Sequence, residues 1–93
     1  MEFEVKKSKE ADKYLKKLQP KQIELIQEAI KQLTKDPLGN PNTKHLKHFS
    51  YKGYDKVYSC RQGDYRILFT VDKEVSELIV LAIKPRGQAC KKK

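Results

Sequence analysis

The stretch Val57–Phe69, VYSCRQGDYRILF, decides the fold, because it joins two runs of alternating side chains through Gly-Asp. A two-residue connection that begins with glycine favours a tight β-hairpin with a mirror-image turn. This closure pairs Arg61 with Arg66 and Cys60 with Ile67, and it predicts strands over residues 56–62 and 65–71. A three-residue loop would instead pair Arg61 with Tyr65 and would place the two arginines on opposite faces.

The two faces of the predicted hairpin differ in character, because side chains alternate along a strand with a period of two. One face is apolar and is assigned to the core: Tyr58, Cys60, Ile67, Phe69 and Val71. The other is mixed and is expected to stay uncovered: Val57, Ser59, Arg61, Arg66, Leu68 and Thr70.

The uncovered face would hold Arg61 and Arg66 side by side, although like charges opposite each other on two strands are destabilising. Guanidinium groups bind phosphates and carboxylates through two parallel hydrogen bonds, so an anion between the arginines would offset the repulsion. The hairpin therefore suggests an anion site. The alternative is that both arginines are simply solvated at an edge.

The rest of the chain predicts two helices and further strands. Phe3 and Val5 alternate with charged residues in a short strand, and Ser8 is placed to cap a helix over residues 9–18. A second helix over 21–35 follows the break at Pro20, with apolar residues at helical spacing. After a loop at 38–42, residues 44–49 indicate a weak strand or an extended lead-in to the hairpin, with Leu46 and Phe49 as its apolar anchors.

The last predicted strand, residues 75–83, is almost entirely apolar, which is typical of a central strand. The order strand, helix, helix, then antiparallel strands predicts an α+β domain with the helical hairpin packed on one face of a small sheet. At 93 residues, the sequence is expected to form one domain over 1–93, ending in a basic tail at 91–93.

Charge is the strongest compositional feature, with 21 Lys and Arg against 12 Asp and Glu and a net charge of +9. This excess attracts polyanions, nucleic acid first and an acidic protein second, although lysines can also serve solubility alone. No signal peptide, membrane span, metal motif or nucleotide-binding motif is found, so we expect a cytoplasmic protein without metal or cofactor. Cys60 and Cys90 do not suggest a disulfide.

The order of elements, the run YxxRxGDYRILF at residues 58–69 and the ending IKPRGQAC resemble the RelE/ParE superfamily of toxins, and its archaeal RelE-like branch in particular. The resemblance extends from Phe3 to Lys91. It implies a type II toxin that enters the ribosomal A site and cuts mRNA by activating the 2′-hydroxyl against the adjacent phosphate. It also implies a RelB-like antitoxin as partner, with the ribosome and mRNA as targets.

The resemblance also implies roles for particular residues. Arg66 corresponds to the arginine that contacts the scissile phosphate, Arg61 to the basic residue of the preceding strand, and Arg86 to an arginine after the last strand. Two positions depart from the family pattern: Ser59 replaces a basic residue, and Cys90 replaces a tyrosine used in acid–base work or base stacking.

Cleavage by the 2′-hydroxyl requires a proton acceptor, positive charge on the phosphorane and a proton donor. Arginine supplies the charge but stays protonated, so the acceptor is left open; the Cys90 thiol is a candidate donor. The expected RNA-binding lysines are Lys47, Lys56 and Lys84, whereas the histidines are expected to be surface residues near the RNA: His45 and His48.

Two other functions fit the same residues. A ParE-like toxin would inhibit DNA gyrase without cutting RNA, and the missing tyrosine favours this function. A non-catalytic module that binds RNA or ribosomes would use the same basic face, with Ser59 and Cys90 marking lost catalysis.

Overall fold

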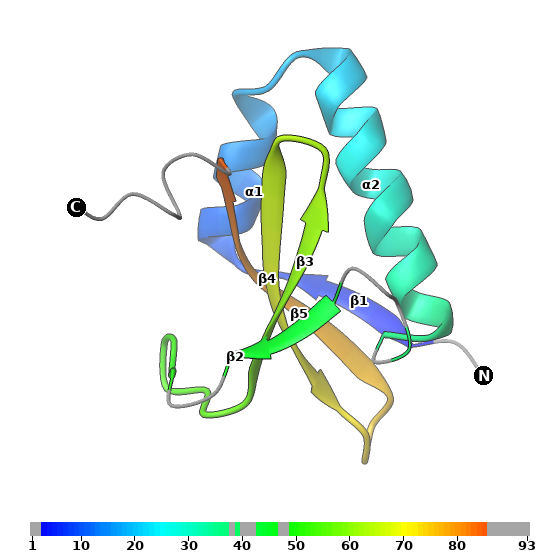
Figure 1. Ribbon diagram of the computed structural model, residues 1–93, viewed down its shortest axis with the longest axis vertical. Helices are drawn as coiled ribbons and strands as arrows, with labels where there is room; N and C mark the ends of the chain where they lie inside the picture. Colours follow the sequence, from blue (N-terminus) through cyan, green and yellow to red (C-terminus); the bar gives the residue numbers. More distant parts are fainter. Residues whose placement is uncertain (1–2, 38, 40–42, 47–48, 86–93) are drawn as a thin grey trace.

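The structure, a computed structural model, describes residues 3–37, 39, 43–46 and 49–85 (Figure 1). Its elements are β1 (Glu4–Lys7), α1 (Lys9–Lys16), α2 (Pro20–Lys35), β2 (Thr43–Leu46), β3 (Val57–Gln62), β4 (Tyr65–Asp72) and β5 (Glu77–Pro85). The strands form one sheet in the order β1-β5-β4-β3-β2, and the predicted α+β class is confirmed. The neighbouring strands pair antiparallel except for β1, which joins the sheet parallel to β5.

Local capping chemistry sets the helix boundaries. The Ser8 hydroxyl accepts a hydrogen bond from the Ala11 N–H at 3.1 Å and donates to the Leu81 carbonyl at 2.7 Å, which fixes α1 on β5. Helix α1 ends at Lys16, two residues earlier than predicted. Helix α2 begins at Pro20, whose fixed φ suits the first turn.

The hairpin of β3 and β4 has the predicted register. Arg61 lies opposite Arg66, and Cys60 lies opposite Ile67. Gly63 has a φ of +58°, whereas Asp64 does not have a positive φ, as a two-residue turn that begins with glycine requires.

Strand β5 is central, as its apolar sequence predicts, and lies between β1 and β4. It begins two residues later than expected, because Val75 and Ser76 belong to the turn after β4. An irregularity opposite Leu68 and Phe69 leaves Leu81 as an extra residue of β5. Val80 and Ile83 therefore belong to one core, whereas Leu81 and Ala82 belong to another.

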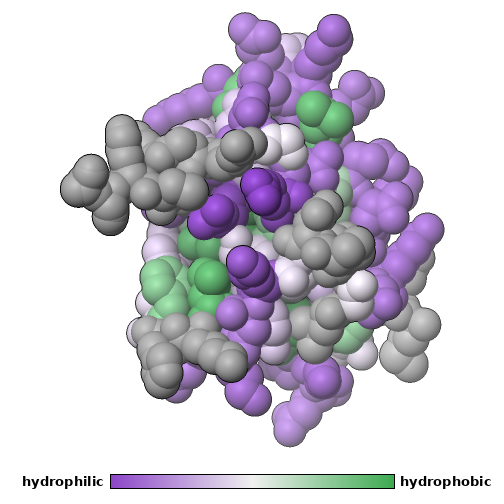
Figure 2. Space-filling view, viewed as in Figure 1, coloured by the Kyte–Doolittle hydropathy of each residue, from purple (hydrophilic) through white to green (hydrophobic). Residues whose placement is uncertain are grey.

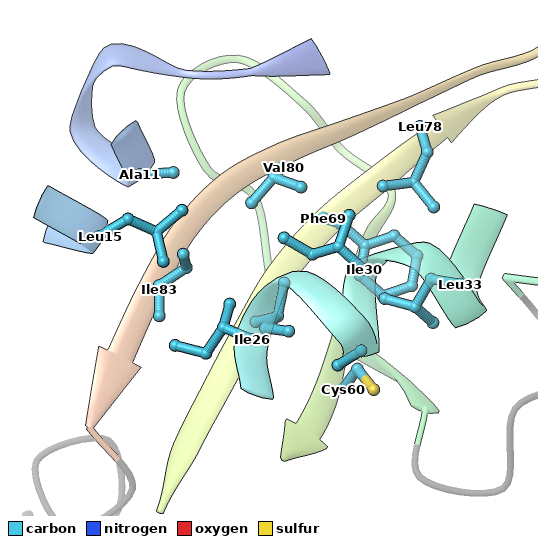
Figure 3. Close-up of a cluster of buried hydrophobic side chains, with 12 residues drawn as sticks. Ala11, Leu15, Ile26, Ile30, Leu33, Cys60, Phe69, Leu78, Val80 and Ile83 are labelled. Atoms are coloured by element: carbon cyan, nitrogen blue, oxygen red, sulfur yellow. The ribbon is translucent and has the colours of Figure 1, made fainter. Parts of the chain in front are cut away.

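The larger core lies between the helices and the sheet, and Figure 3 shows its packing. Phe69 and Ile67 from β4 are fully buried there, together with Ile26 and Leu33 of α2. The face assigned to this core from the sequence is confirmed: Tyr58, Cys60, Ile67, Phe69 and Val71 all belong to it or pack against it.

The prediction that the opposite face is uncovered is wrong for most of its length. A second core forms there around Val57, Leu68, Leu81 and Ala82, and Leu46, Tyr51 and Ile79 pack against it. Ser59 and Thr70 are each only 6% exposed. The physical reason is that β2 and the segment after it supply side chains to this face, which an isolated hairpin does not reveal. On this face, the charged side chains next to the hairpin turn, Arg61 and Arg66, remain at least partly accessible.

Among the described residues, no helix is long and apolar enough to cross a membrane.

Candidate functional site

Three cationic side chains lie in a row across β3, β4 and β5. Arg61 pairs with Arg66, and Arg66 pairs with Lys84 on its other side. Residues directly opposite each other on neighbouring strands have Cβ atoms about 4.5–5.5 Å apart. The Cβ atom of Arg66 therefore lies between those of Arg61 and Lys84, next to each of them. Arg61 is exposed, and Arg66 and Lys84 are partly buried. We call Arg61, Arg66 and Lys84 the basic row.

The basic row lies on the face opposite the helices. Hydrophilic side chains gather across the middle of the face shown in Figure 2, with hydrophobic side chains below them toward the left. The sequence predicted that Arg61 and Arg66 share this face, and the sheet adds Lys84 to them. A phosphate bridging neighbouring members of the row would meet two or three donors held on rigid strands.

A carboxylate, Glu10 in the first turn of α1, lies at the Lys84 end of the row. Its two oxygens accept hydrogen bonds from the Tyr51 hydroxyl at 2.9 and 2.8 Å. The Lys52 ammonium lies 2.9 Å from Glu10, and the Lys84 ammonium lies 3.7 Å away. Glu10 therefore joins α1, the 51–54 turn and β5 through four polar contacts.

The protonation of this cluster follows from its contacts. The hydrogen bonds from Lys52 and then from Tyr51 lower the pKa of Glu10. Burial, together with the hydrogen bond to Glu10, raises the pKa of Tyr51 to about 12. At neutral pH Glu10 is an anion and Tyr51 is a neutral donor, so the pair holds structure together and is poorly suited to proton transfer.

An aromatic pair lies beside the same cluster. The rings of Phe49 and Tyr51 stack with centroids 6.3 Å apart and planes 16° from parallel. The ammonium groups of Lys52 and Lys84 each lie 5.8 Å from the centroid of the Tyr51 ring. Phe49 is 39% exposed, so the expectation that it anchors the 44–49 strand in a core is wrong.

The structure does not bring Lys56 to the basic row. Lys56 precedes β3, at the opposite end of that strand from Arg61, and lines an open cavity of about 390 Å³ with Tyr54 and residues 70–74. The length of β3 therefore separates Lys56 from Arg61, and its predicted contact with RNA would lie away from the basic row. Lys47, His48, Arg86 and Cys90 lie outside the described residues.

His45 and Cys60 lie on the other side of the sheet from the row. The His45 ring packs 4.9 Å from the ring of Tyr58, its partner in register, and stays exposed. Cys60 is buried in the larger core, and burial raises the pKa of its thiol. Neither is placed to act on a group bound at the row. In the part of the chain that the structure describes, no cluster of three or more His, Cys, Asp or Glu could hold a metal ion.

Sequence reasoning missed Glu10, Tyr51 and Lys52. Glu10 lies within the helix predicted over residues 9–18, and Tyr51 and Lys52 lie between the strands predicted over 44–49 and 56–62. The contacts of Glu10 with Tyr51 and Lys84 depend on how α1 docks on β5, and no local sequence pattern predicts them.

Solved structures share this arrangement of helices and sheet. A chain of the archaeal RelE–RelB complex from Pyrococcus horikoshii OT3 aligns over 95% of this chain and 99% of its own, with a TM-score of 0.77 and 26% identity. A chain of the toxin–antitoxin complex RelBE2 from Mycobacterium tuberculosis aligns over 92% and 100%, with a TM-score of 0.75 and 26% identity. The Escherichia coli RelBE complex, at 16% identity and a TM-score of 0.58, shares the fold alone.

These likenesses define the class of fold, which is that of the RelE toxins. No curated protein sequence gives a significant match. A family model, described as the ParE toxin of type II toxin–antitoxin systems, matches residues 5–90. The chain therefore belongs to this toxin family, within the RelE/ParE superfamily and on its RelE-like side.

Proposed function

We propose that this toxin is an endoribonuclease that cuts mRNA in the ribosomal A site, by attack of a 2′-hydroxyl on the adjacent phosphate. The observation that carries the proposal is the basic row, which sets Arg61, Arg66 and Lys84 on three neighbouring strands. Developing negative charge on a phosphorane is stabilised best by fixed donors of this kind.

In this mechanism the row binds the scissile phosphate, and Arg66, at its centre, contacts the most phosphate oxygens. Arg86 adds a further positive charge, an assignment that rests on the resemblance in sequence. Cys90 stands where the family has a tyrosine, and its thiol is the candidate proton donor to the 5′-oxygen. Glu10 is a weak proton acceptor because its pKa is lowered. We therefore do not place the proton acceptor at Glu10, and we propose a group of the ribosome for this step.

The proposed partner is a RelB-like antitoxin, acting with the toxin in the cytoplasm. Two of the most similar solved structures are toxin–antitoxin complexes. A net charge of +9 favours an acidic segment, and such a segment laid over the basic row would exclude RNA from it.

The test is to induce the toxin in growing cells and to map cleavage of translated mRNA by primer extension. Arg66→Ala should abolish both cleavage and growth arrest while leaving the protein folded, and Arg86→Ala should act similarly. Lys92→Ala, in the basic tail, should have no effect and is the matched control. A folded, fully toxic Arg66→Ala variant would show that the basic row is not the site of cleavage.

A second candidate function is inhibition of DNA gyrase, and the match to the ParE toxin family model favours it. The same induction experiment separates the two. Intact mRNA together with arrested DNA replication would assign the toxin to gyrase.

A further inference from the structure

We infer that Phe49, stacked on Tyr51, is a platform on which a nucleobase of single-stranded RNA stacks, next to the phosphate held at the basic row. This inference rests on the proposed RNA substrate and adds a base-binding subsite to it. The partner is RNA, because the surface around the platform is cationic.

The first observation is that Phe49 is an aromatic side chain without a core to occupy. It belongs to neither hydrophobic core, and 39% of its surface is exposed. Tyr51, which stacks against it, packs on the second core instead. The accessible face of this stacked ring is a surface on which a nucleobase can stack, as bases do on aromatic side chains of proteins that bind single-stranded RNA.

The second observation is that hydrogen bonds fix the position of Tyr51, the ring on which Phe49 stacks. The Tyr51 hydroxyl donates to both oxygens of Glu10, and the backbone groups of Tyr51 and Tyr54 exchange hydrogen bonds of 3.0 and 2.9 Å. The Tyr51 ring therefore has a fixed position on α1 and on its own turn. A stacking surface that is ordered before binding loses little entropy when a base arrives.

The third observation is charge. The ammonium groups of Lys52 and Lys84 lie 5.8 Å from the centroid of the Tyr51 ring, and Lys84 is the register partner of Arg66. The surface thus runs from Phe49 through Tyr51 and Lys84 to the arginines. Proteins that bind single-stranded RNA combine aromatic rings with a cationic path for the backbone in this way.

The experiment measures binding of a short single-stranded RNA, 2′-O-methylated to block cleavage and labelled with 2-aminopurine, to the purified full-length toxin. Removing one stacking ring weakens binding by about 5-fold to 150-fold. Phe49→Ala and Phe49→Leu should both show this weaker binding and should no longer quench 2-aminopurine. Phe49→Trp should keep both the RNA affinity and the quenching of 2-aminopurine. Arg66→Ala, which removes a positive charge and no ring, is measured for comparison.

Salt dependence separates stacking from charge. Phe49→Ala should leave the slope of log affinity against log salt unchanged. Arg66→Ala should reduce that slope by about 0.7, because the variant neutralises one phosphate fewer. Because Phe49 is 39% exposed and belongs to neither core, its variants should remain folded at the temperature of the binding assay, which thermal unfolding checks.

Several outcomes would overturn the platform. If Phe49→Leu binds like the wild type, the interaction is apolar and does not depend on stacking. If all Phe49 variants bind RNA as tightly as the wild type while Arg66→Ala binds it weakly, Phe49 is not a stacking platform, but the proposed RNA substrate stands. If Phe49→Ala weakens only the binding of an antitoxin peptide, the surface belongs to a protein partner. If the wild type binds no RNA, free or in ribosomes, both proposals fail.

Discussion

Replacing Glu10 by Gln should make the protein less stable and at the same time a stronger RNA binder. The substitution keeps the size of the side chain and the hydrogen bond from Tyr51, but it removes the charge that Lys52 and Lys84 face. Lys52, and Lys84 at the end of the basic row, would then lose their anionic partner and would attract phosphate more strongly. Stability and affinity therefore move in opposite directions.

The loss of stability can be worked from the structure around Glu10. The Glu10 and Lys52 side chains are 39% and 45% exposed, so their ion pair contributes only about 0.2–1 kcal/mol. The Tyr51 bond loses the advantage of an ionised acceptor, about 1 kcal/mol. Together these terms lower the free energy of unfolding by about 1–2 kcal/mol, and Tm by about 5–15 °C for a domain of this size.

The pH dependence has a definite sign. Because the folded pKa of Glu10 lies below its ordinary value of 4.5, its stabilising contribution is fully present above that value. It is lost as the pH falls through the lowered folded pKa. The difference in stability between wild type and Glu10→Gln should therefore be largest near neutral pH and should shrink in acid.

The assay is thermal unfolding followed by RNA binding at several salt concentrations. Asp12→Asn is the matched control, because it removes the same charge from the same helix and breaks an exposed pair with Lys16 at 3.6 Å. Glu10→Gln should steepen the salt slope by about 0.7 for each lysine released, and the control should not. Equal stability of the two variants, or weaker RNA binding by Glu10→Gln, would refute the reasoning.

Two further changes test the core and the departure at residue 90. Phe69→Ala leaves a cavity at a fully buried site in the larger core and should lower the free energy of unfolding, measured with urea, by about 3–5 kcal/mol. The control Val75→Ala, at a residue that is 59% exposed, should change that free energy by no more than about 0.5 kcal/mol. Cys90→Tyr restores the family's tyrosine and should raise the rate of mRNA cleavage after induction. A rate no faster than that of the wild type would show that Cys90 does not limit activity.

Much of the fold follows from local sequence. Gly63-Asp64 fixes the register that sets Arg61 opposite Arg66, because a two-residue turn allows one pairing of the strands. Ser8 marks the start of α1, and Pro20 marks the start of α2. The period of two then assigns Cys60, Ile67 and Phe69 to the core beneath the helices.

Other features could not be read from the sequence, since they depend on packing between distant segments. The extra residue in β5 turns Leu81 toward the second core, although its sequence is a uniform apolar run. Phe49 looks like a strand anchor, but the strand ends at Leu46 and the ring is left exposed.

By itself, the sequence determined the class of fold, the pairing of Arg61 with Arg66 and the excess of positive charge, because these depend on local turns, periodicity and composition. Only the tertiary structure decided which groups complete the site. It brought Lys84 beside Arg66 through the pairing of β4 with β5. It also docked Glu10 against Tyr51, since packing across the sheet joins residues that lie 41 positions apart.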